Sequence, residues 1–358
     1  MFGIVLVVMV SNEPDNDTIV DDDIDTTIDK ATEYSFVYSW NLDQSSNPVA
    51  IAINSYEVYV LDYENNLIQR FTKDGRSYFE WSIRQEGLSF PLDMAIDSDN
   101  NIYVLDDDDI FKFTEYFDNV TRLNLPEKEI TSNNELVIDS ENNVYVFGND
   151  MLKFDSKGSL IKEWSLPTYD FGRYGIAYSF DVDSNDNVYV LYGFGIDKYD
   201  KNGNMKEHID YTPAEKISLS YGDKISIDTQ DNIFILDQTN EMIHMILNNG
   251  THITSWGYSG YDKGEFFGID DMEFNSQNIA YVLDSENKRI QVFMDRFLLP
   301  QPPLKQVKSG IALQNVECKI GKTLVQKAIN GSPACVYFTS VDKLVERLWT
   351  ISDVTPSK

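Results

Sequence analysis

The sequence is poor in histidine, cysteine and basic residues. Three histidines in 358 residues leave few ligands for a zinc site and few candidates for a general base. This scarcity disfavours a metallohydrolase or a lyase that depends on histidine. Lysine and arginine number 29 against 59 acidic residues, which gives a formal net charge of -30. Such a charge repels nucleic acids and anionic membrane surfaces, so neither is expected as a direct partner.

Several catalytic motifs and long hydrophobic runs are also missing. The chain has no nucleophile-elbow motif, no phosphate-binding glycine loop and no CxxC pair. The apolar run FGIVLVVMV, from Phe2 to Val10, is too short to span a bilayer. A strongly acidic stretch follows it. We interpret residues 1–10 as an export or anchor segment and residues 11–33 as an acidic linker, and therefore expect a secreted or cell-surface protein, anchored through its N-terminus in the second case.

A short motif repeats six times in the middle of the chain. The copies are YVLD from Tyr59, YVLD from Tyr103, YVFG from Tyr145, YVLY from Tyr189, FILD from Phe234 and YVLD from Tyr281. They are spaced by 42 to 47 residues. Each copy has an alternating apolar and polar stretch with a polar turn before it, and one or two further alternating stretches after it. Four short strands in 40 to 50 residues are typical of a β-propeller blade.

The two ends of the repeat region predict how the ring closes. The last unit has only three strands before the proline-rich segment FLLPQPPLKQ, and prolines end strand pairing. The segment YSFVYSW, Tyr34 to Trp40, matches the fourth strands SYFEW and LIKEW but precedes the first complete unit. We therefore predict an all-β fold over residues 34–298, a six-bladed β-propeller with four-stranded antiparallel blades. The N-terminal strand is expected to close the last blade and so to remove the open sheet edges.

Four consecutive aspartates, Asp106 to Asp109, fall between the predicted second and third strands of the second unit. Aspartate accepts backbone hydrogen bonds and tolerates turn geometry. It also stands at this place in Asp62, Asp237 and Asp284. We therefore predict a chain reversal here rather than a metal site.

The repeat units resemble a known family. The segments DSDNNIYVLD, DSENNVYVFG, NNLIQRF and NKRIQVF are similar to NHL repeats, and the resemblance covers roughly Tyr34 to Phe297. It implies a six-bladed propeller. Members of the family include extracellular binders, sensor domains and a few lyases, so the fold does not choose the function. Gly148 and Tyr192 depart from the pattern, because aspartate is expected at both positions.

A second, small unit follows the repeats. Residues 299–303 form a proline-rich linker, and residues 304–350 predict a small α+β domain followed by a tail, 351–358. LVQKAINGSPACVYF reads as a hairpin and TSVDKLVERLW as a helix. The two cysteines, Cys318 and Cys335, suit one disulfide or two unrelated buried thiols. The small size of the unit favours a disulfide, which would contribute about 3 kcal/mol. The SPACV and KLVERLW segments resemble a C-terminal domain of exported proteins from ammonia-oxidising archaea, which implies export.

The residues that open the innermost strands of a propeller face its central channel. In register these are Ala50, Asp93, Glu135, Ser179, Lys224 and Asp271. Asp93, Glu135 and Asp271, with the neighbouring Asp270, form a candidate axial site for a hard cation such as Ca2+. The alternative is a solvated channel mouth in which Lys224 offsets part of the acidic charge.

Aromatic residues give a second candidate site. The segment PTYDFGRYGIAYS contains Tyr169, Phe171 and Tyr174, which with Lys224 are candidate ligand-binding residues. The alternative is that these rings pack between blades. We predict a non-catalytic, monomeric extracellular binding or scaffold propeller that recognises a protein, a glycan or a small ligand on one face. The alternative function is a calcium-dependent propeller enzyme, a lyase or lactonase-like hydrolase, that uses the axial carboxylates.

Overall fold

The computed structural model describes residues 34–107, 109–126, 135–147, 150–168, 176–211, 223–295, 303–308, 316, 322–327, 333–337 and 349–351. The propeller unit spans residues 32–295, and the C-terminal elements belong to a separate unit. Each unit is described by itself. Within the described ranges, no helix is long and apolar enough to cross a membrane.

The propeller consists of six four-stranded antiparallel sheets, as predicted. Blade 1 contains β2 (Pro48–Ile53), β3 (Glu57–Asp62), β4 (Leu67–Thr72) and β5 (Ser77–Ser82), and a 3-10 turn (Arg84–Glu86) follows it. Blade 2 contains β6 (Asp93–Ile96), β7 (Ile102–Leu105), β8 (Asp109–Phe113) and β9 (Val120–Asn124). Blade 3 contains β10 (Leu136–Ile138), β11 (Val144–Phe147), β12 (Asp150–Phe154) and β13 (Leu160–Ser165).

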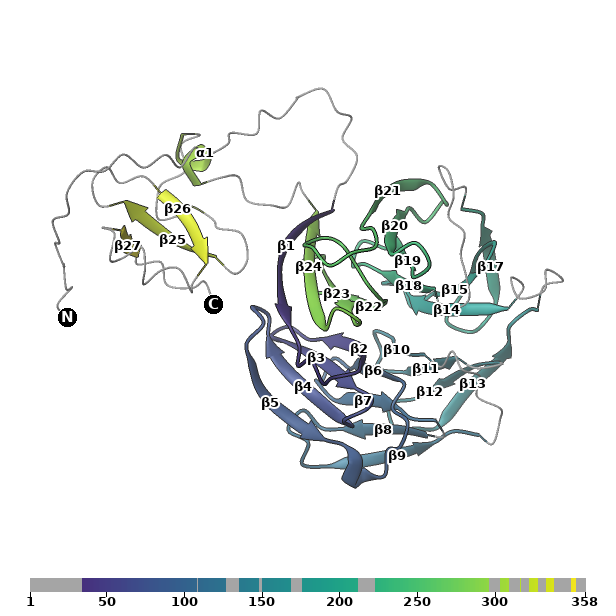
Figure 1. Cartoon of the computed structure of the whole chain (residues 1–358). Coiled ribbons are helices and arrows are strands. Elements are labelled where there is room, and N and C mark those ends of the chain that lie inside the picture. Colours follow the sequence, from purple (N-terminus) through teal and green to yellow (C-terminus); the bar gives the residue numbers. More distant parts are fainter. Residues whose placement is uncertain are drawn as a thin grey trace. The chain divides into compact units, whose positions relative to one another are not determined.

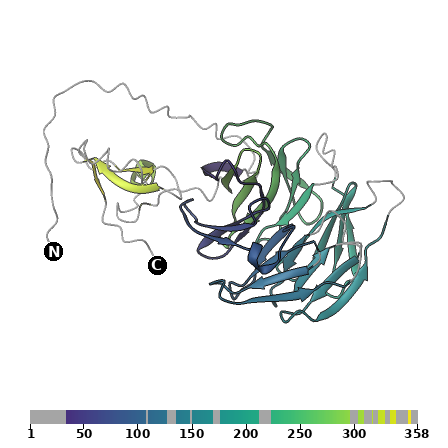
Figure 2. The same cartoon turned by 60° about the horizontal axis from the view of Figure 1, so that its bottom comes forward.

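The second half of the ring repeats this order. Blade 4 contains β14 (Ala177–Val182), β15 (Val188–Tyr192), β16 (Gly195–Tyr199) and β17 (Met205–Ile209). Blade 5 contains β18 (Lys224–Ile227), β19 (Ile233–Asp237), β20 (Met242–Ile246) and β21 (His252–Trp256). Blade 6 contains β22 (Ile269–Phe274), β23 (Ile279–Asp284), β24 (Arg289–Asp295) and β1 (Tyr34–Asn41). Figure 1 and Figure 2 show the blades following one another in the order of the sequence colours, from purple to green.

The N-terminal strand closes the ring, as the sequence predicts. β1 pairs antiparallel with β24, from Tyr34 opposite Asp295 to Asn41 opposite Arg289. The purple strand lies beside the light green one in Figure 1. A chain segment from one end of the repeat region thus covers the edge left at the other end, which ties the first strand to the last.

The hydrophobic core lies between adjacent blades. The tyrosines that open the repeat motif, such as Tyr59, Tyr103 and Tyr145, are fully buried. Each of the hydrophobic clusters draws its residues from two neighbouring blades; the cluster around Tyr59, for example, includes Val104 and Phe113 of blade 2. The aromatic and β-branched residues of the motif therefore join the blades to one another.

The predicted reversal lies between β7 and β8: Asp106 and Asp107 follow β7, Asp109 opens β8, and Asp108 lies outside the described residues. The Asp106 carboxylate accepts hydrogen bonds from the backbone amides of Ser89, at 3.1 Å, and Phe90, at 2.6 Å. Asp109 opens β8 and forms an ion pair with Arg122. Asp106 thus fixes the loop that enters the blade, which is a structural role.

The C-terminal unit contains α1 (Pro303–Lys308) and a sheet with the strand order β26, β25, β27. β25 (Lys322–Lys327) pairs antiparallel with β26 (Pro333–Tyr337), and the turn of the predicted hairpin lies outside the described residues. Trp349 is a correction: it opens β27 (Trp349–Ile351) and pairs with Lys327, so it belongs to a strand. The rest of the expected helix, residues 339–348, lies outside the described residues. Cys335 lies in β26 but Cys318 lies outside the described residues, so the disulfide stays a prediction.

Candidate axial site

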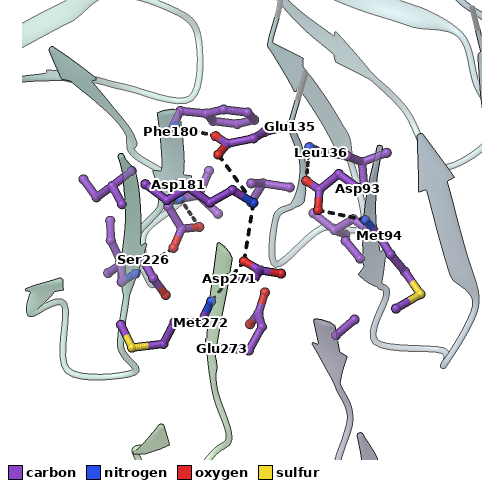
Figure 3. Close-up of a pocket in the computed structure, with 18 of the residues that line it drawn as sticks. Asp93, Met94, Glu135, Leu136, Phe180, Asp181, Ser226, Asp271, Met272 and Glu273 are labelled. Atoms are coloured by element: carbon purple, nitrogen blue, oxygen red, sulfur yellow. Dashed lines mark hydrogen bonds and ion pairs between the residues drawn. The ribbon is translucent and has the colours of Figure 1, made fainter. Parts of the chain in front are cut away.

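The predicted register brings charged residues from four blades to one level of the propeller. Asp93, Lys224 and Asp271 each pair with the leucine of their blade's repeat motif: Leu105, Leu236 and Leu283. These three residues and Glu135 line one cavity of about 220 Å³ (Figure 3). Four of the residues singled out in the sequence therefore do come together.

Asp270 differs from its neighbour Asp271, because it is not among the residues that line the cavity. Its carboxylate oxygen lies 3.2 Å from the side-chain amide of Gln238. Burial raises the pKa of Asp270, and the nearby Lys224 opposes this effect. Tyr169, Phe171 and Tyr174 lie outside the described residues, so their predicted role in binding stays a prediction.

Two further acids, which the sequence did not single out, also line the cavity. Asp181 follows Ser179 by two positions in β14, and Glu273 follows Asp271 by two positions in β22. Side chains two residues apart in a strand point to the same face. The alternation along the innermost strands was thus the signal that identifies both residues.

The axial carboxylates accept hydrogen bonds from the innermost strand of the next blade. The pairs are Leu136 N to Asp93 Oδ2 at 2.8 Å, Phe180 N to Glu135 Oε2 at 2.9 Å, Ile227 N to Asp181 Oδ2 at 2.7 Å and Ile51 N to Asp271 Oδ2 at 2.7 Å. An innermost strand has an unpaired edge toward the channel, where its amides need partners. Four of the acids therefore link blade to blade.

Lys224 lies between two of these acids. Its Nζ is 3.9 Å from Glu135 Oε1 and 3.6 Å from Asp271 Oδ1. Burial alone would lower the pKa of Lys224, but the charges of Asp271, Asp93 and Glu135 outweigh it and raise that pKa. The amine therefore stays a cation at neutral pH and compensates the acids around it.

Burial dominates the titration of the axial acids. It raises the pKa of Glu135 from 4.5 to about 8, against the opposing effect of Lys224. Burial also raises the pKa of Asp181 to about 7 and that of Asp93 to about 6. Burial, followed by the charge of Asp271, places the pKa of Glu273 well above 4.5. The carboxyl of Glu273 forms no hydrogen bond with any described residue.

The predicted calcium site finds no support in this geometry. A calcium ion needs six to eight oxygen ligands, but Asp93, Asp181 and Asp271 each use both carboxylate oxygens in hydrogen bonds to backbone amides. The Lys224 amine already neutralises Glu135 and Asp271. Among the described residues, no three histidine, cysteine, aspartate or glutamate side chains are grouped so that they could hold a metal ion.

The chain was compared with known proteins. No family model and no curated protein matches the sequence. Virginiamycin B lyase from Staphylococcus aureus has a similar structure, with a TM-score of 0.54 and 13% identity over 73% of this chain and 99% of that one. The likeness lies in the fold.

Two further solved structures share this fold. A catalytically inactive histidine-to-alanine variant of the staphylococcal lyase, with quinupristin, matches with a TM-score of 0.52 and 12% identity, over 73% of this chain and 99% of that one. An auxiliary nutrient binding protein from Bacteroides ovatus matches with a TM-score of 0.52 and 11% identity, over 73% of each chain. Propellers of this shape thus include both an enzyme and a binding protein.

Proposed function

We propose that this chain is a non-catalytic binding propeller of a secreted or cell-surface protein, and that a small polar ligand with amine or hydroxyl groups binds in the axial cavity. The observation that carries the proposal is that the carboxyl of Glu273 lines the cavity and has no hydrogen-bond partner among the described residues. Among the axial acids described above, Glu273 is the one without a hydrogen-bond partner in the described part of the chain, and it faces the cavity (Figure 3). The carboxyl of this half-buried residue is therefore available to form hydrogen bonds with a ligand or water in the cavity.

The remaining axial groups suit the same kind of ligand. Asp93, Asp181 and Asp271 are held in place by backbone amides, so their positions are fixed before a ligand arrives. Each of these oxygens keeps a second lone pair, which can accept a hydrogen bond from an amine or a hydroxyl of the ligand. The net charge of -30 also attracts small cations from solution.

Histidine positions argue against a histidine-dependent reaction at the axis. His208 and His252 lie in the outermost strands β17 and β21, and His244 lies in the third strand β20. None of the three lines the axial cavity. The inactive variant of the structurally similar lyase has an alanine in place of one histidine. No histidine lines the axial cavity of this chain.

A second candidate function rests on the raised pKa values of Glu135 and Asp181, about 8 and about 7. Groups that titrate near neutral pH transfer protons efficiently, and perturbed pKa values cluster at active sites. A propeller lyase or lactonase-like hydrolase would use Glu135 as general acid. Binding is favoured over this reading because both acids are tied to backbone amides of the next blade.

Thermal-shift measurements test the proposal. Wild-type protein is heated at pH 7 with glucosamine, galactosamine, spermidine, lysine or glucono-δ-lactone, and each compound is then recovered for mass spectrometry. The proposal expects a stabilising compound that is recovered unchanged. Its effect should be lost in Glu273→Ala and kept in Asp99→Ala, a matched removal of an exposed acid. A converted compound, or a shift that survives Glu273→Ala, would contradict the proposal.

A further inference from the structure

The turns between the first and second strands of the blades form a second face of the propeller. Five of the six turns contain an asparagine or aspartate with positive φ: Asn100 at 63°, Asn142 at 63°, Asp186 at 62°, Asp231 at 62° and Asn278 at 56°. Asparagine and aspartate tolerate this left-handed conformation better than other residues with a side chain. Blades 2 to 6 therefore share one turn structure.

All five of these side chains connect one blade to the blade before it. Asn100 Oδ1 of blade 2 accepts a hydrogen bond from Asn54 Nδ2 of blade 1, at 3.1 Å. In the other four places the side-chain oxygen accepts a hydrogen bond from a backbone amide of the preceding blade's turn. The bonds run from Ser98 N to Asn142 Oδ1 at 3.0 Å, Ser140 N to Asp186 Oδ1 at 3.0 Å, Ser184 N to Asp231 Oδ1 at 2.9 Å and Thr229 N to Asn278 Oδ1 at 3.0 Å. Each oxygen accepts a hydrogen bond from a turn amide that has no partner in the strand pairing. Together with the bond to Asn100, they form a partial ring of hydrogen bonds from blade 1 to blade 6.

The ring is interrupted between blade 6 and blade 1, because the turn of blade 1 is one residue shorter. Asn54 N binds Glu57 O, whereas in blade 2 the equivalent bond runs from Asp97 N to Asn101 O. The position of the left-handed residue is therefore missing from blade 1. Ser276 of blade 6 is the counterpart of Ser98 and Thr229, and among the described residues no acceptor binds its backbone amide.

A recess of about 270 Å³ lies at this interruption. It is bounded by the turns of blades 6, 1 and 2, and hydroxyl and amide groups of Ser55, Ser98, Asn100 and Ser276 line it. Its volume is near the lower end of ligand pockets, which is about 300 Å³. The recess thus offers both donors and acceptors of hydrogen bonds.

The lining of the recess carries no available charge. Asp97 is its one charged residue, and both of its carboxylate oxygens are occupied. Oδ1 accepts hydrogen bonds from the Asn101 amides, and Oδ2 binds Asn101 Nδ2 and, at 3.2 Å, Lys112 Nζ. A charged ligand would therefore lose its hydration without gaining a counter-charge.

We propose that this recess is a binding site for a neutral glycan. Sugar hydroxyls both donate and accept hydrogen bonds, as the serine and asparagine side chains here require, and a sugar oxygen can accept the Ser276 amide. Tyr56 lies at the tip of the short turn and is 76% exposed. Tyr56 directly follows Ser55, which lines the recess, and its exposed ring is a flat apolar surface on which the apolar face of a bound sugar could stack.

Affinity electrophoresis of the full chain tests the proposal. The gels contain laminarin, mannan or hydroxyethyl cellulose as neutral polysaccharides, and alginate as a charged one. The proposal expects one or more neutral polysaccharides to retard the wild-type protein and alginate not to retard it. Tyr56→Ala should weaken the retardation about tenfold. Tyr116→Ala removes an equally exposed tyrosine, 73% exposed, between β8 and β9 and should leave it unchanged.

A second variant tests the role of the short turn. An asparagine inserted between Tyr56 and Glu57 restores the turn length of the other blades, so it should supply the missing acceptor for Ser276 and fill the recess. Retardation should then be lost while the melting temperature is kept. If circular dichroism shows that this variant does not fold, the double variant Ser55→Ala and Ser276→Ala replaces it. The proposal is overturned if no neutral polysaccharide retards the wild type, or if Tyr56→Ala binds as well as the wild type.

Discussion

Acidification is expected to stabilise the propeller between pH 8 and pH 5. Burial raises the pKa of Glu135 from 4.5 to about 8, so the folded protein holds this proton more tightly than the unfolded chain does. The stability that this proton contributes is complete below pH 4.5 and is lost as the pH rises through about 8. Burial of Asp181, with a pKa of about 7, and of Asp93, with a pKa of about 6, acts in the same direction.

The size of the effect follows from the two pKa values of Glu135. The difference between about 8 and 4.5, at about 1.36 kcal/mol for each pH unit, corresponds to a loss of up to about 4 kcal/mol in the free energy of unfolding at pH 8. Glu135→Gln removes this loss because glutamine does not ionise. The glutamine side-chain oxygen still accepts the hydrogen bond from Phe180 N.

Urea denaturation at pH 5, 6, 7 and 8, at constant ionic strength, measures the effect. The unfolding free energies of wild type and Glu135→Gln should be similar at pH 5 and should diverge as the pH rises, with the variant more stable by up to about 4 kcal/mol at pH 8. Parallel pH profiles would refute the reasoning. Glu141→Gln is the matched control: the pKa of this exposed acid is lowered by Lys201, so it contributes no slope in this range.

The remaining predictions concern charge, backbone and metal. Lys224→Met leaves Asp271 without its cation and should lower the unfolding free energy by about 3 kcal/mol at pH 8, but by less at pH 5, where the buried acids bind protons; urea denaturation at both values measures this. Gly75→Ala should lower the melting temperature more than Gly87→Ala. Both glycines have positive φ, but a Cβ at Gly75 would lie 2.5 Å from Trp40, whereas a Cβ at Gly87 meets no atom within 4 Å. EDTA should leave the melting temperature unchanged, and plasma mass spectrometry should find no stoichiometric calcium; one Ca2+ per chain, lost in Asp93→Ala, would contradict this.

Much of the fold could be predicted because each blade repeats the same local signals. The alternation around Tyr103 or Tyr281 specifies strands, and aspartates such as Asp106 specify the reversal between them. The closure of the ring could be predicted because the last unit lacked its fourth strand and the segment from Tyr34 had no unit of its own. Trp349 was misassigned because the apolar spacing of KLVERLW is helical, whereas pairing with Lys327 places it in a sheet.

The site could be predicted only in part. Register alone brought Asp93, Glu135 and Asp271 to one level, because every blade pairs this position with the same residue of its repeat motif. Their use as acceptors for the next blade could not be read from the sequence, since it depends on the angle between blades. Glu273 was missed although it follows Asp271 by two positions, because only the first residue of each strand was considered.

The central claim is that the axial cavity binds a ligand without converting it. Isothermal titration calorimetry at pH 7 with the stabilising compound from the thermal-shift panel tests this most directly. We predict heat pulses that saturate at one ligand per chain and return to the baseline after each injection, and that disappear in Glu273→Ala. A sustained heat flow after each injection, abolished in Glu135→Gln, would show turnover and would contradict the account.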